Sequence, residues 1–128
     1  MMLKNILMVA VGGSIGAVTR YLISLWAVAR IGADFPYGTL IANVVGCFII
    51  GVFMTITMEK FIVSSHMRLL VTVGFLGGLT TFSSFSYETF KVFGDAGFNI
   101  AMYNVLANIV LGFLATWGGI LLGKMIAM

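Results

Sequence analysis

The stretch "GFLGGLTTFSSFS", residues 74–86, interrupts one of the most apolar parts of the chain. It holds three Gly, two Thr and three Ser where a membrane-spanning helix would ordinarily carry Leu and Val. Each Gly in a helix interior costs about 1 kcal/mol relative to Ala. We therefore expect this helix to break between Gly77 and Thr80, near the middle of a span. Carbonyl groups freed by the break cannot face lipid and have to be satisfied inside the protein.

The composition is that of a membrane protein. Of 128 residues, 61% are hydrophobic and only 9% are charged, whereas a soluble domain carries roughly 25% charged residues. One Pro and no Gly/Ser-rich linker predict a single domain, residues 1–128. The net charge of +3 is diffuse, so nucleic acid is not implied. Cys47 lies in an apolar run and is interpreted as a small buried residue.

Four segments are long enough to cross a bilayer, which takes about 20 apolar residues each. They are residues 6–29, 37–58, 69–90 and 99–122. Short connections make neighbouring spans antiparallel, and the predicted fold is an all-α bundle of four transmembrane helices with the third broken. Lys4, the apolar run and Ala27–Ala29 resemble a cleavable secretory signal, but the length of the run and Arg20 within it favour a retained span.

Basic residues give almost no bias in orientation. One side of the membrane would hold Lys4, Lys60, Arg68 and Lys124, and the other Arg20, Arg30 and Lys91. Charge therefore leaves two alternatives open. The chain inserts in a single orientation, or it inserts in both and assembles as an antiparallel dimer. Four helices of this size enclose a hydrophilic path poorly, which favours a homodimer. Glycine pairs such as Gly12 and Gly16 allow close helix packing, within or between subunits.

Polar residues recur on the fourth span every four positions, at Asn104, Asn108, Gly112 and Thr116. This spacing places them in one stripe along a helix. Amide and hydroxyl donors flanked by apolar residues suit an anion that has lost its water. Hydrogen bonding between helices explains the stripe equally well.

Charged residues are nearly absent from the spans. Glu88 is the only acid in one, close to its end, so neither a proton-coupled exporter nor a cation channel built on carboxylates is favoured. Arg20 either attracts anions to a vestibule, reaches the headgroups, or pairs with a carboxylate such as Glu88. Ser83 and Ser84 have no His or Lys near them in sequence to act as a base, so we do not expect an enzyme.

Two aromatic residues follow the predicted break. Phe82 and Phe85 are three apart and share a helix face. A ring edge carries partial positive charge and is a weak anion ligand, although such a pair is also typical of ordinary packing. Carbonyl clusters at broken helices bind cations in other membrane proteins. The break at Gly77–Thr80 is therefore a candidate site for a monovalent cation, shared with a partner subunit.

These segments resemble one known family over the whole chain. "GGSIGAVTRY" (12–21), "PYGTLIANVVGCFIIG" (36–51) and the third-span stretch ending in "SYETF" (86–90) are similar to the motifs of the Fluc/CrcB fluoride channels. The resemblance implies an antiparallel, dual-topology homodimer in a bacterial inner membrane, with two fluoride pores and a central structural Na⁺. Passive export of fluoride would then protect the cell from its toxicity.

The resemblance also implies roles for individual residues. Phe82 and Phe85 would line the pores with their ring edges, and Asn43 would donate a hydrogen bond to fluoride. Carbonyl groups of Gly77 and Thr80 from both subunits would hold the Na⁺. Other expected pore and vestibule residues are Thr39, Ser83, Ser84, Asn104, Asn108, Thr116 and, at the vestibule, Arg20. Some members carry Tyr and Ser where this chain has Asn in the fourth-span stripe, and Gly112 offers no side-chain donor.

Two other functions are weighed against a fluoride channel. A small multidrug exporter is also a four-span dimer, but it needs a membrane-embedded Glu in its first span, where this chain has Arg20. A non-transporting assembly subunit would give no ion flux in purified vesicles.

Overall fold

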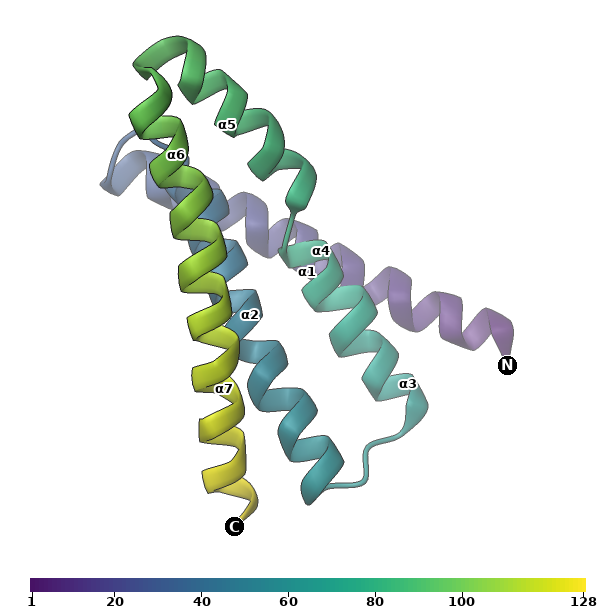
Figure 1. The fold of residues 1–128 in the computed structure, drawn as a ribbon. Helices are drawn as coiled ribbons and strands as arrows, with labels where there is room; N and C mark the ends of the chain where they lie inside the picture. The colour runs from purple at the N-terminus through teal and green to yellow at the C-terminus, as the bar shows by residue number, and fades with distance from the viewer.

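A computed structural model describes all 128 residues as helices joined by short connections, without strands. Figure 1 shows the order of the elements along the chain. They are α1 (Met2–Arg30), α2 (Tyr37–Glu59), α3 (Ser65–Arg68), the π-helix η1 (Leu69–Leu76), α4 (Gly77–Leu79), α5 (Phe82–Ala96), α6 (Phe98–Leu106), the π-helix η2 (Ala107–Leu111) and α7 (Gly112–Ala127).

These elements form four helices long and apolar enough to cross a membrane: Met2–Arg30, Tyr37–Glu59, Ser65–Ala96 and Phe98–Ala127. The predicted spans lie within them. The segment after residue 90, taken from the sequence as a connection, is helical to Ala96, and Gly97 alone joins α5 to α6. Its φ of 96° lies in the left-handed region that favours glycine. Large apolar side chains remain exposed along all four helices, as expected of a multi-pass membrane protein.

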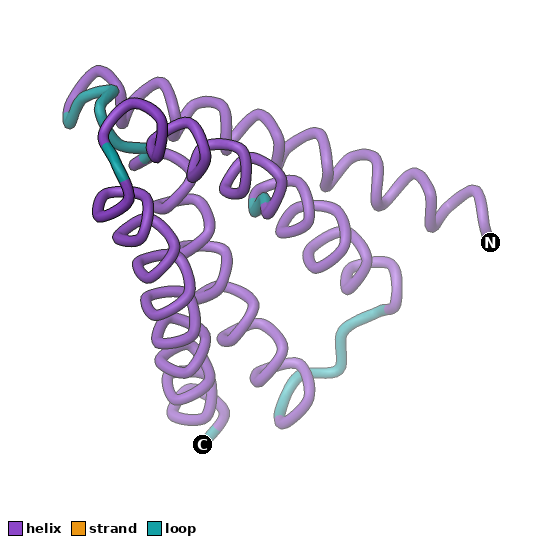
Figure 2. The backbone as a smooth tube through the Cα atoms, turned by 45° about the horizontal axis from the view of Figure 1, so that its top comes forward, coloured by secondary structure: helices purple, strands orange, loops and turns teal.

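The helices pack as two pairs (Figures 1 and 2). α2 runs alongside η2 and α7, whereas α1 crosses behind and packs on η1 and α4. α5 continues beyond α4 and returns through α6 to the first pair. A small core of Ala42, Leu76 and Leu79 forms where α2 meets the third membrane-spanning helix, Ser65–Ala96, which is called the third helix from here on. The two pairs are therefore joined closely at the level of the break.

Glycines allow α1 and the third helix to cross in close contact. A Cβ atom on Gly78 would lie 2.6 Å from the carbonyl oxygen of Gly13, and one on Gly74 would lie 2.9 Å from the Cα atom of Gly12. Small residues let two helix backbones approach this closely in lipid. Gly74 and Gly78 therefore serve packing within the subunit and stay helical, which corrects the expectation that they break the helix.

The break itself lies at Thr80 and Thr81, so it overlaps the predicted segment Gly77–Thr80 only at its last residue. Thr80 (φ −86°, ψ 153°) and Thr81 (φ −151°, ψ 123°) are extended, while Gly77 is still helical. The N–H of Thr81 donates to Oδ1 of Asn43 at 2.8 Å, so it is lost to the helical ladder. The hydroxyl of Thr81 accepts from the N–H of Ser84 at 3.1 Å and caps α5. Competition by polar side chains thus breaks this helix.

Candidate functional site

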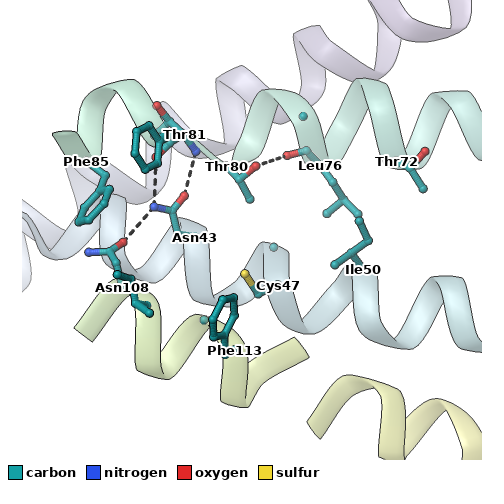
Figure 3. A pocket seen from close by; sticks show the side chains of 15 residues that line it. Asn43, Cys47, Ile50, Thr72, Leu76, Thr80, Thr81, Phe85, Asn108 and Phe113 are labelled. Atoms are coloured by element: carbon teal, nitrogen blue, oxygen red, sulfur yellow. Dashed lines mark hydrogen bonds between the residues drawn. The ribbon is translucent and has the colours of Figure 1, made fainter. Parts of the chain in front are cut away.

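An open groove of about 490 Å³ lies at the break, between α2, the third helix and the η2–α7 segment (Figure 3). None of its fifteen lining residues is charged. Its polar side chains are Asn43, Thr72, Thr80, Thr81 and Asn108, and its aromatic ones are Phe82, Phe85 and Phe113. Cys47 is half-buried in the wall rather than fully buried, because α2 turns this face toward the groove.

Asn43 lies at the centre of the polar contacts. Its amide nitrogen donates to the carbonyl oxygen of Thr81 at 3.2 Å and to Oδ1 of Asn108 at 3.0 Å. Its own oxygen accepts from the N–H of Thr81. Both amide hydrogens of Asn43 are therefore engaged within the protein.

The contacts continue from Asn108 away from the groove. Its amide nitrogen donates to the backbone oxygen of Asn104 at 2.9 Å and to Oδ1 of Asn104 at 3.1 Å. Asn104, which is only 1% exposed, donates to the hydroxyl of Thr89 at 2.9 Å. That hydroxyl donates to the carbonyl oxygen of Phe85 at 2.7 Å. The series from Asn43 to Thr89, called the amide chain below, thus links α2, α6, η2 and the first turns of α5.

The two phenyl rings after the break meet edge to face. The ring centroids of Phe82 and Phe85 are 5.6 Å apart, with 68° between the ring planes. Phe85 is 9% exposed, but Phe82 is 77% exposed. Packing within one chain therefore accounts for Phe85 and leaves most of Phe82 uncovered.

The carbonyl groups of Gly77 and Thr80 are among those that lose their helical partners at the break. In a continuous helix, Gly77 would accept from the N–H of Thr81 and Thr80 from that of Ser84. Those N–H groups donate instead to Asn43 and to the Thr81 hydroxyl. Gly77 and Thr80 both line the groove. Uncharged carbonyl oxygens at a broken helix are typical ligands of monovalent cations in membrane proteins.

Arg20 and Glu88 do not pair with each other. The Nε atom of Arg20 donates to the carbonyl oxygen of Gly78 at 3.0 Å. Glu88 accepts from the hydroxyl of Thr39 at 2.6 Å. Thr39 and Glu88 line a second cavity of about 510 Å³ beside the α1–α2 connection, together with Lys91. Arg20 therefore acts on the backbone of the break, while Thr39 belongs to a separate polar cavity.

Comparison with known proteins identifies the family. The family model described as "CrcB-like protein, Camphor Resistance (CrcB)" matches residues 7–120. The chain belongs to this family.

Curated relatives cover almost the whole of this CrcB-family chain. A protein of Geobacter metallireducens is 44% identical over 120 residues, which make up 94% of this chain and 97% of the relative. One from Solibacter usitatus is 46% identical, covering 92% and 97%, and one from Geobacter sulfurreducens is 46% identical, covering 95% and 98%. Each of these relatives is named "Fluoride-specific ion channel FluC".

The remaining predicted site residues of this CrcB-family chain lie outside the lining of the groove. Ser83 and Ser84 lie in the first turn of α5, and Thr116 lies farther along α7. Sequence reasoning missed the roles of Thr81 and Thr89. Thr81 is a residue type typical of a helix N-cap, but Thr80, Ser83 and Ser84 are equally suitable by sequence, so the pattern alone does not select Thr81 as the start of α5.

Proposed function

We propose that the chain forms a fluoride channel that lets F⁻ leave a bacterial cell passively through the inner membrane and so confers fluoride resistance. The relatives are named fluoride-specific ion channels. The observation that carries the proposal is the uncharged groove at the break, where amide groups and phenyl rings meet. Ion conduction, unlike enzyme chemistry, needs no base beside Ser83 and Ser84.

Fluoride is costly to remove from water. Moving such an ion from water into a medium of low dielectric costs on the order of 20 kcal/mol. Donors such as the Asn43 amide and the edges of Phe82 and Phe85 offset that cost. They carry no formal charge, so the ion is released again, as conduction requires. A narrow path of this kind favours fluoride over the larger chloride.

A second, antiparallel copy completes the channel in this proposal. One chain leaves the groove open and Phe82 mostly uncovered. The weak charge bias of four basic residues against three is compatible with insertion in both orientations. Two copies would form two pores and bring together the carbonyl groups of Gly77 and Thr80 from both subunits, which suit a structural Na⁺.

Arg20 and several residues outside the groove also have roles in the proposed channel. We assign Arg20 to a vestibule, where its contact with Gly78 also fixes its position. The other proposed pore residues are Thr39, Ser83, Ser84, Asn104, Asn108 and Thr116. A multidrug exporter is not supported, since α1 contains no carboxylate.

Fluoride efflux from liposomes that contain only the purified protein tests this function. We expect the parent to conduct, and Phe82→Ile and Asn43→Ala each to lower the flux at least about tenfold, which corresponds to about 1.4 kcal/mol. Phe98→Ile and Asn5→Ala, remote from the groove, are the matched controls and should conduct like the parent. Absence of flux in the parent would exclude the proposed function. Parental flux in both groove variants would exclude the assigned site.

A further inference from the structure

The Thr89 end of the amide chain fixes the direction of every hydrogen bond in it. The carbonyl oxygen of Phe85 can only accept, so the hydroxyl of Thr89 must donate to it. Thr89 therefore accepts from Asn104, which places the nitrogen of the Asn104 amide toward Thr89 and its oxygen toward Asn108. Asn108 must then turn its nitrogen to Asn104 and its oxygen to Asn43.

The Asn43 end of the amide chain gives the same orientation for the two side-chain amides. The backbone N–H of Thr81 can only donate, so it fixes the oxygen of Asn43 toward itself and the nitrogen toward Asn108. Figure 3 shows the carboxamide oxygen of Asn108 pointing at Asn43 and its nitrogen pointing away. Both hydrogens of that nitrogen face oxygens of Asn104. Asn108 thus offers the groove an acceptor and has no donor left for an anion.

One bond of Asn43 has no second bond beside it, although at 3.0 Å it is shorter than the 3.2 Å bond to the carbonyl oxygen of Thr81. Asn43 and the backbone of Thr81 exchange two hydrogen bonds, which form a closed ring. The bond from Asn43 to Asn108 is single and joins two side chains. Asn108 lies in the π-helix η2, a rare turn that occurs often at functional sites. The Asn43–Asn108 bond is therefore the one that an incoming anion can replace.

We infer that Asn108 is a positioning residue whose carboxamide oxygen competes with fluoride for an amide hydrogen of Asn43. The inference rests on the proposed function. Asn43 is half-buried at the groove and keeps a partner when no ion is bound, so its amide donor is not left unpaired. Each fluoride ion displaces Asn108, so its net binding is weaker than a free donor would give. Such weak binding is what rapid conduction needs.

The effect of Asn108→Ala on the half-saturating fluoride concentration of efflux tests this inference. We expect that concentration to fall about two- to tenfold, because a typical neutral hydrogen bond no longer competes for Asn43. Asn5→Ala, which removes the partner of His66 far from the groove, is the control and should not change it. An unchanged or higher value in Asn108→Ala, with a conducting parent, would overturn the inference and leave the proposed function standing. Absence of flux in the parent would instead count against the proposed function.

A spectroscopic measurement on the parent does not depend on the variant folding. The side-chain amide protons of Asn43, assigned by comparison with Asn43→Asp in lipid nanodiscs, report the bond to Asn108. We expect one of the two proton resonances to shift as fluoride is added, while the other, bonded to Thr81, moves less. Resonances that stay in place at saturating fluoride would contradict an exchange of acceptors.

Discussion

The third helix has two faces that differ in how they are packed. Toward α1, Gly74 and Gly78 bring backbone against backbone, with no space for a methyl group. Toward the groove, a Cβ atom on Gly77 would meet nothing closer than the carbonyl oxygen of Thr72, at 3.9 Å. Three glycines in one short stretch therefore serve two purposes. The tight face anchors the helix, so that the open face can lose its helical bonds without losing its position.

The largest expected effect comes from filling the tight face. In Gly16→Val, the new side chain meets the backbone of Phe75 and Leu79. We expect a loss of about 3 kcal/mol or more in the free energy of unfolding, at the upper end of overpacking effects. A lower midpoint of thermal aggregation in detergent than that of the parent reports the destabilisation. Gly118→Val is the matched control, since a Cβ atom there meets nothing within 4 Å. Equal losses in both variants would show that the close packing of α1 on the third helix does not account for the destabilisation.

A smaller effect is expected where the tight face reaches the break. Arg20→Met removes the hydrogen bond to the carbonyl oxygen of Gly78. Hydrogen bonds from charged groups contribute about 1.5–3 kcal/mol, and we expect a loss of unfolding free energy in the lower part of that range because Arg20 is only half-buried. Arg30→Met, at the exposed end of α1, is the control. Lower fluoride flux with unchanged stability would instead assign Arg20 to anion attraction alone.

The smallest effect is expected on the open face itself. Thr81→Val removes the cap of α5 but keeps the backbone N–H that donates to Asn43. Loss of an N-cap costs about 0.5–2 kcal/mol. Thr19→Val, whose hydroxyl bonds only the preceding turn of α1, is the control for loss of a hydroxyl group. If the two variants melt at the same temperature, the cap does not stabilise the break.

The four spans and the existence of a break were predictable, because hydropathy and the content of Gly, Thr and Ser are local properties of the chain. The position of the break was not, since it depends on Asn43, 38 residues away from Thr81. The contact of Arg20 with Gly78 was not predictable either. The charge of Arg20 suggested an anion vestibule, the lipid headgroups or a carboxylate partner, but the break exposes a carbonyl oxygen within its reach.

The residues of the candidate site were predicted better than their orientations. Asn43, Asn108 and Phe85 do lie together, from three different helices. Which atom of Asn108 faces Asn43 follows only from bonds that extend through Asn104 to Thr89. The sequence pattern suggested a stripe of donors, whereas the folded chain turns one of them into an acceptor.

The unequal connections between helices have a practical use in topology mapping. Gly97 alone forms the elbow between α5 and α6, so an inserted peptide there would separate two helices that pack on each other. Lys60–Ser64 is irregular, and the side chain of Ile62 is fully exposed. An epitope placed at Ile62 leaves every helix intact. Antibody access to it from each side of sealed vesicles then counts how many copies face each way.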